Sequence, residues 1–151
     1  MGAAGQFERG TDGSRVILVG VDGSPTSLRA AAYAAGLARR QCSRLVAVFV
    51  EEPPPSMAGW VPEARAIARD AAAQVGEELR RELQPAAEQL GIEVELRTAH
   101  GDPVTELSRI ADELPADAVL VGASEQAGHR VIGSVAVRLV RVGRWPVTVV
   151  P

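Results

Sequence analysis

Short apolar runs alternate with longer stretches of helical character along most of this chain, and that alternation constrains the fold more than any other feature. Strands that alternate with helices in this way pair in parallel, because right-handed helical crossovers return the chain to the same end of the sheet. The pattern predicts an α/β fold with a single doubly wound parallel five-stranded sheet, in the order 3-2-1-4-5, and helices on both faces. The expected strands are residues 15–22, 44–50, 92–98, 118–122 and 146–150.

Three of the expected helices have clear boundaries. Ser24 supplies an N-cap hydroxyl and Pro25 a pre-set first helical φ for a helix that runs to about Gln41. Two shorter helices are expected at 104–113 and 134–142.

A longer helix begins near Glu63 and is expected to end at Gly91. Pro85 lies inside it and should kink or divide it. Residues 51–62 before it hold four prolines, so they form a loop over the sheet edge or a lid. The buried face of the helix is expected to carry residues spaced about four apart, namely Ile67, Ala71, Val75, Leu79, Leu83, Ala87 and Leu90.

The length of 151 residues fits one domain, which we place at residues 15–151. Residues 1–14 are rich in small and charged residues without periodicity, and we expect a flexible N-terminal tail there. No apolar stretch is long enough for a signal peptide or a membrane span. Cys42 is the only cysteine, so we expect no disulfide, a small buried side chain and a cytoplasmic location.

All sixteen basic residues are arginine. The absence of lysine excludes mechanisms that need one, such as Schiff-base formation and phosphate binding by a Walker-type loop. The net charge of −3 argues against a general nucleic-acid binder. Four arginines against Glu125 alone make residues 118–151 mildly basic, which favours an anionic ligand there or reflects solvated helix faces.

The ends of two expected strands carry the residues that point to a ligand. The first strand ends at Asp22, and the fourth ends at Gly122, with Gly133 and Ser134 opening the last helix. In the expected strand order these positions are neighbours, at the carboxyl edge where such sheets bind ligands. A helix N-terminus suits phosphate, and glycine allows a close approach of the main chain. The residues therefore indicate a nucleotide site, or else glycines that only make tight turns.

Over residues 15–151 the chain resembles the universal stress protein family. The resemblance rests on five segments in the same order and spacing: residues 21–24 (VDGS), 100–103 (HGDP), 121–124 (VGAS), 133–135 (GSV) and 145–150 (WPVTVV). It implies a doubly wound fold, a homodimer, and membership of either a nucleotide-binding or a non-binding branch.

The ATP-binding branch has a motif of glycine, two residues, glycine, nine residues, and then glycine with Ser or Thr. Gly122 and the pair Gly133–Ser134 match its two ends. Glu125 stands where the second glycine belongs, and the loop is two residues shorter. Arg130 in that loop is either a forked donor to phosphate or an exposed arginine.

The resemblance implies roles for individual residues, and each has a structural alternative. Asp22 would meet the adenosine end of the ligand or cap a turn, and Val50 would face adenine or pack within the sheet. Ser134 and Val135 would meet the phosphates, although Ser134 can equally cap its helix. The two histidines, His100 and His129, lack the further ligands that a metal site needs, so no metal is expected.

The first reading is a stress-response regulator that binds an adenine nucleotide, ATP by the family motif, and is at most a weak ATPase. The alternative is a dimeric interaction scaffold of the same family without nucleotide. A true enzyme ranks third, because no catalytic base or cofactor motif is found. The apolar, β-branched strand 146–150 at the sheet edge predicts a homodimer that pairs two such strands. Neither nucleic acid nor a membrane is an expected partner.

Overall fold

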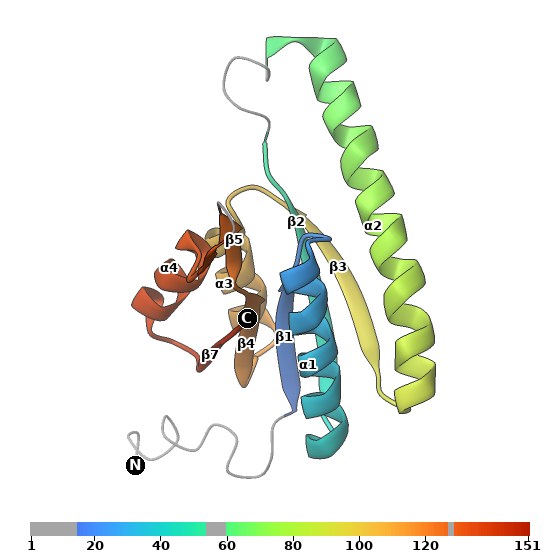
Figure 1. The fold of residues 1–151 in the computed structure, drawn as a ribbon, viewed down its shortest axis with the longest axis vertical. Helices are drawn as coiled ribbons and strands as arrows, with labels where there is room; N and C mark the ends of the chain where they lie inside the picture. The colour runs from blue at the N-terminus through green and yellow to red at the C-terminus, as the bar shows by residue number, and fades with distance from the viewer. Residues whose placement is uncertain (1–14, 54–59, 127–128) are drawn as a thin grey trace.

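A computed structural model of the chain describes residues 15–53, 60–126 and 129–151 (Figure 1). Its main sheet has five parallel strands in the order β3-β2-β1-β4-β7, which confirms the predicted fold and strand order. The predicted tail and most of the proline-rich loop lie outside the described residues. The strands are β1 (Val16–Val21), β2 (Arg44–Glu51), β3 (Val94–His100), β4 (Ala118–Gly122) and β7 (Val147–Val150).

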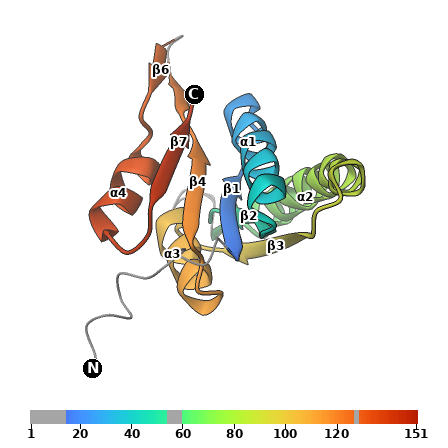
Figure 2. The same ribbon diagram turned by 90° about the horizontal axis from the view of Figure 1, so that it is seen from below.

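Two helices cover each face of this sheet (Figure 2). A core of apolar side chains lies on each side, one beneath α1 and α2 and the other beneath α3 and α4. No helix among residues 15–53, 60–126 and 129–151 is long and apolar enough to cross a membrane. The helices are α1 (Pro25–Gln41), α2 (Pro62–Leu90), α3 (Pro103–Glu113) and α4 (Ser134–Val142).

Helix α1 begins as its sequence predicts, because the Ser27 N–H donates to the Ser24 hydroxyl at 3.2 Å. Its alanines allow it to lie close to the sheet, where Ala30, Ala34 and Ala38 are fully buried. The helix ends at Cys42, which has φ 53 in the left-handed region. Cys42 is exposed, so the expectation of a buried cysteine was wrong.

Helix α2 is a single helix of 29 residues that continues through Pro85. The proline therefore does not divide it: Pro85 is exposed, and water can bond the carbonyl that its missing N–H leaves free. The helix ends at Gly91 with φ 63, as predicted.

The N-terminal half of α2 rises beyond the ends of the strands (Figure 1). Ile67 there is 69% exposed and Ala71 is also exposed, so two members of the predicted apolar face lie in solvent. Leu79 and Ala87 are buried, and the other three members are partly buried. A regular spacing predicts which residues share a helix face, but it cannot show where the sheet beneath that face ends.

A small antiparallel hairpin, β5 (Ser124–Gln126) and β6 (His129–Val131), lies between β4 and α4 and was not predicted. It stands out from the body of the molecule (Figure 2). The backbone of Glu125 pairs with that of Arg130. The segment in which the family motif predicts a phosphate loop therefore adopts strand pairing.

The two tryptophans lie in opposite environments. Trp145 is 6% exposed in the core on the α3 and α4 side of the sheet, and the Arg144 guanidinium lies 5.0 Å from the centroid of its ring. Trp60, just before α2, is 88% exposed.

The ends of β4 and α1 approach each other more closely than any side chain would allow. A Cβ atom added to Gly122 would lie 2.6 Å from the carbonyl carbon of Thr26 and 2.7 Å from the nitrogen of Ser27. Both of these atoms belong to the backbone, so they cannot move aside as a flexible side chain could. Gly122 is therefore required by packing, whether or not a ligand binds beside it.

An ion pair joins α3 to α4. The Arg138 guanidinium donates to both carboxylate oxygens of Asp102, at 2.8 and 2.9 Å. The same carboxylate caps α3 by accepting from the Thr105 N–H at 2.9 Å. Arg138, followed by the Thr105 N–H, holds the pKa of Asp102 well below its usual range.

We expect Gly122→Ala to lower the free energy of unfolding by about 3 kcal/mol, because the new methyl group meets backbone. Gly76→Ala is the matched control: its Cβ would lie 3.9 Å from Phe49, within α2, and should raise stability by about 0.5–1 kcal/mol. Urea unfolding followed by circular dichroism measures both. Equal stabilities for wild type and Gly122→Ala would contradict the close contact.

Asp102→Ala should lower the free energy of unfolding by about 1–2 kcal/mol at pH 7, mainly through loss of the α3 cap, because the exposed ion pair is screened. A carboxylate whose folded pKa is depressed stabilises the fold above its unfolded pKa, near 3.9, and loses that contribution as pH falls. The difference between wild type and variant should therefore narrow below about pH 4. Arg138→Ala keeps the cap and should destabilise less. A difference that is constant from pH 7 to pH 2 would refute this role of Asp102.

Candidate functional site

A cavity of about 1340 Å³ opens at the carboxyl edge of the main sheet. The ends of β1, β2 and β4 form its floor, and the first turns of α1, α3 and α4 and the N-terminal half of α2 surround it. The chain leaves β1 for α1 on one face and reaches β4 from α3 on the other, so this is the point where the strand order reverses. Ligands of doubly wound folds bind at such a position.

Six of the seven binding residues predicted from the sequence line this one cavity. Arg130, the seventh, lies in β6, where only the backbone is described. The fold therefore brings together residues from four separate parts of the chain. The six are Asp22, Val50, Gly122, Gly133, Ser134 and Val135.

Asp22 is held at the end of β1 by its neighbours. Its carboxylate accepts from the Ser24 N–H at 2.9 Å, and its own N–H donates to the Ser27 hydroxyl at 3.2 Å. Burial acts to raise the pKa of Asp22, but hydrogen bonding to its carboxylate, chiefly from Ser24, outweighs burial, and the pKa lies below its usual value. Asp22 is therefore an ionised acceptor, suited to hydroxyl or amine donors of a ligand.

Among α1, α3 and α4, whose first turns line the cavity, only α4 lacks a side-chain cap; α2, which begins farther from the sheet, has none at its N-cap Val61 either. Ser24 caps α1 and Asp102 caps α3, whereas the N-cap of α4 is Gly133, whose position makes no side-chain hydrogen bond. Ser134 is the first residue of α4, so it does not cap the helix in this structure. The first N–H groups of α4 are thus available to an anion in the cavity.

Gly133 also has a packing role. A Cβ atom added there would lie 3.1 Å from the Cβ of Ser124, at the base of the hairpin. Packing therefore requires glycine at position 122, where backbone lies against it, and leaves little room for a side chain at position 133, where Ser124 would have to shift slightly. The sequence alone could not separate this role from the close approach of a ligand.

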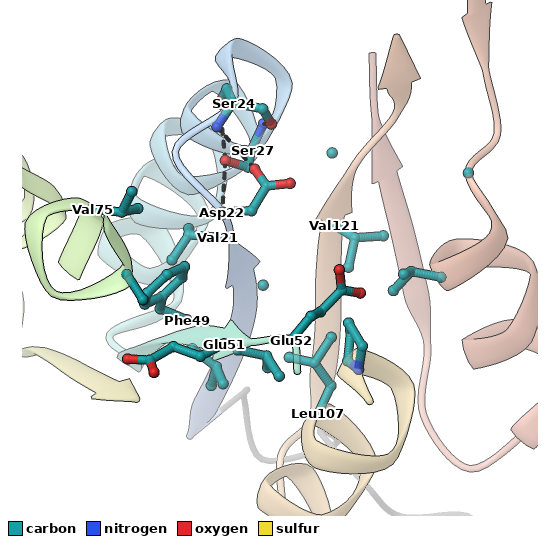
Figure 3. Close-up of a pocket in the computed structure, with 18 of the residues that line it drawn as sticks. Val21, Asp22, Ser24, Ser27, Phe49, Glu51, Glu52, Val75, Leu107 and Val121 are labelled. Carbon is teal, nitrogen blue, oxygen red and sulfur yellow. Dashed lines mark hydrogen bonds between the residues drawn. The ribbon is translucent and has the colours of Figure 1, made fainter. Parts of the chain in front are cut away.

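The charged residues on the other side of the cavity were not predicted from the sequence. Glu51 and Glu52 line it at the end of β2, and Arg65 and Arg69 line it on α2. Figure 3 shows Glu52, from the segment after β2, and Asp22, from the end of β1, pointing into the space between β1 and β4. Two sequence features could have indicated these residues. One is the pair Glu51–Glu52 directly after an apolar strand, and the other is the spacing of four between the two arginines on a helix.

His100 closes one side of the cavity. Its Nδ1 lies 2.9 Å from a carboxylate oxygen of Glu51, and the Gly101 N–H donates to the Glu51 carbonyl at 3.0 Å. In the described parts of the chain, no three His, Cys, Asp or Glu side chains are grouped so that they could hold a metal ion.

Two of the arginines that make the C-terminal part basic are engaged elsewhere. Arg138 pairs with Asp102, the N-cap of α3, and Arg144 donates to Asp112 of α3 at 2.6 Å. Neither lines the cavity. Part of the positive charge of residues 118–151 is therefore engaged in ion pairs with α3 and its N-cap, and is not directed into the cavity.

Comparisons with known proteins agree on one family. The model of the universal stress protein family matches residues 13–151. A universal stress protein of Methanocaldococcus jannaschii is 26% identical over 136 residues, which cover 89% of this chain and 80% of that protein.

Two solved structures show the same likeness. A member of the family from Burkholderia pseudomallei is 28% identical with a TM-score of 0.75, and the match covers 91% of this chain and 96% of that one. A universal stress protein solved in complex with cAMP is 27% identical with a TM-score of 0.69, and the match covers 92% and 98% of the two chains. Fold, motifs and these matches together show that this chain belongs to the universal stress protein family.

Proposed function

We propose that this chain binds an adenine nucleotide in the cavity and acts as a stress-response regulator rather than as a fast enzyme. The observation that carries the proposal is the uncapped N-terminus of α4, which faces the same cavity as the ionised carboxylate of Asp22. A helix N-terminus favours phosphate, and a carboxylate accepts from ribose hydroxyls or from an amine.

The arrangement orients the nucleotide. Phosphate would lie at Gly133, Ser134 and Val135, and the adenosine would lie across the ends of β1 and β2, near Asp22 and Val50. Support comes from the relative in complex with cAMP, and the family motif adds ATP. The ligand chemistry common to both is adenosine that carries phosphate.

The hairpin changes how phosphate can be held. In place of a loop long enough to wrap a triphosphate, the chain has the paired strands β5 and β6. The phosphate contact then rests mainly on the N–H groups of α4, with Arg130 of β6 as a proposed additional donor.

We expect Ser134→Glu to weaken nucleotide binding about tenfold or more, because a carboxylate at the start of α4 repels phosphate nearby. The same carboxylate favours the helix, so the variant should remain folded. Ser134→Gln is the matched control, with nearly the same shape and no charge, and should lose much less affinity. Calorimetric titration of the three proteins with ATP, AMP and cAMP measures this. Failure of all three ligands to bind wild type at millimolar concentration would refute the proposed function.

The second candidate, a dimeric scaffold of the same family, is favoured by the open edge of β7. The N–H groups of Val119 and Ala123 donate to the carbonyls of Pro146 and Val150, so these β7 residues face β4. Because backbone groups alternate along a strand, the N–H and C=O groups of Val147 and Val149 face outward. An edge of this kind can pair with the same edge of a second copy, and we propose a homodimer through residues 146–150.

Val149→Pro should convert this dimer to monomer, because proline removes an outward N–H and leaves the bonds to β4 in place. Val149→Ala keeps the N–H and should remain dimeric, which controls for lost side-chain packing. Light scattering coupled to size exclusion reports the mass of each protein. A wild-type monomer, or a Val149→Pro dimer, would exclude this interface.

A further inference from the structure

Two carboxylates point into the middle of the cavity. Figure 3 shows Asp22, at the end of β1, and Glu52, from the segment after β2, directed into the space between β1 and β4. Hydrogen bonding, chiefly from Ser24, keeps the pKa of Asp22 below its usual value, so this carboxylate is charged near neutral pH. Glu51 also lines the cavity, but its side chain points away from Glu52, and its carboxylate lies 2.9 Å from Nδ1 of His100.

The arginines of the cavity lie away from that space. Among the described residues that line the cavity, the arginines are Arg65 and Arg69, both on the N-terminal half of α2. That half rises beyond the ends of the strands (Figure 1), and α2 and α4 cover opposite faces of the sheet (Figure 2). Both arginines are therefore remote from the start of α4, where the phosphate of the proposed nucleotide lies.

The start of α4 supplies only a small positive charge. The free N–H groups of a helix N-terminus and the helix dipole together amount to about half of an elementary charge. The hairpin that precedes α4 contains one acid and one arginine, Glu125 and Arg130, so its formal charges cancel. Arg138 of α4 is paired with Asp102 and does not line the cavity. Such an N-terminus suits one phosphate group, and further phosphate groups add negative charge that these residues do not balance.

A longer phosphate chain has two ways to lie in this cavity, and both are unfavourable. If its first phosphate lies at α4, the others extend away from the adenosine, past α4, where the hairpin has no net charge. If its last phosphate lies at α4, the others lie between the ends of β1 and β4, in the space that Asp22 and Glu52 face. Like charges repel each other there, and a cleft focuses the field of its acidic side chains.

We propose that the cavity selects an adenine nucleotide with a single phosphate group, and that the Glu52 carboxylate disfavours longer phosphate chains by repulsion. This inference rests on the proposed function, because it takes the phosphate to lie at the start of α4. Glu52 sets the selectivity, since it makes no hydrogen bond or ion pair with any residue that the structure describes. Asp22, by contrast, is held by Ser24 and is oriented toward the hydroxyl or amine donors of adenosine.

The test compares AMP, ADP and ATP by calorimetric titration in magnesium-free buffer. The three nucleotides share adenosine and differ only in the number of phosphate groups. We expect affinity to fall along this series, with AMP bound about tenfold more tightly than ATP by wild type, the effect of unbalanced charge near a solvated site. With magnesium added, ATP should still bind no more tightly than AMP, because no three possible metal ligands are grouped in the described parts of the chain.

The variant Glu52→Gln should bind ATP about fivefold more tightly than wild type, with nearly the same affinity for AMP. Residue 52 is exposed and lies outside the strands and helices, so the variant should fold. Glu51→Gln is the matched control: it removes the same charge from the neighbouring residue, whose side chain points toward His100 instead, and should keep the preference of wild type for AMP.

Equal affinity of wild type for AMP and ATP without magnesium would overturn the inference, as would tighter binding of ATP with or without magnesium. A preference for AMP that is unchanged in Glu52→Gln would overturn it too. In each of these cases nucleotide still binds, so the proposed function stands. If none of AMP, ADP and ATP binds wild type, the inference falls, and the proposed function falls with it if cAMP also fails to bind.

Discussion

The pairing of β1 with both β2 and β4 determines where the cavity of this molecule lies. Ile17, Leu18 and Val19 pair on both sides and are completely buried, so the strand has no freedom to shift. Because α1 and α2 lie on one face and α3 and α4 on the other, the connections diverge beyond the carboxyl ends of β1 and β4. The cavity follows from this divergence, whatever residues line it.

Some polar groups at this edge of the sheet are bonded within the chain, and others are left for a ligand. The caps of α1 and α3, the bonds that hold Asp22, and the contact of His100 with Glu51 are all satisfied within the chain. The start of α4 and the two arginines on α2 have no such partners in the described residues. A site in which most groups are already bonded is preorganised, so a ligand needs to order little when it binds.

The fold was predictable because its signals are local and strong. Buried parallel strands are nearly continuous apolar runs, and the start of α1 and the end of α2 carry their own capping residues, Ser24 and Gly91. The positions of Asp22 and Gly122 in the cavity followed from strand order alone. Each of these features depends on a single segment or on the strand order alone, and sequence patterns indicate both.

The features that the sequence did not predict depend on contacts between distant segments. Gly122 appeared to serve a ligand, whereas the structure places the backbone of Thr26 against it. The exposure of Ile67 depends on where the sheet ends beneath α2. The pairing of Glu125 with Arg130 joins two strands of only three residues each, which are too short to leave a clear pattern in the sequence. Arg65 and Arg69 line the cavity because α2 packs against β3 and α1, an arrangement that their spacing on a solvated helix does not reveal.

The opposite burial of the two tryptophans gives the molecule two native optical reporters. Trp145 emits from a dry core between sheet and helices, so its fluorescence follows the loss of tertiary packing. Trp60 is exposed to solvent just before the start of α2, close in sequence to the part of α2 that lines the cavity. A soluble quencher reaches Trp60 and not Trp145, so changes at α2 and global unfolding can be followed separately without attaching a dye.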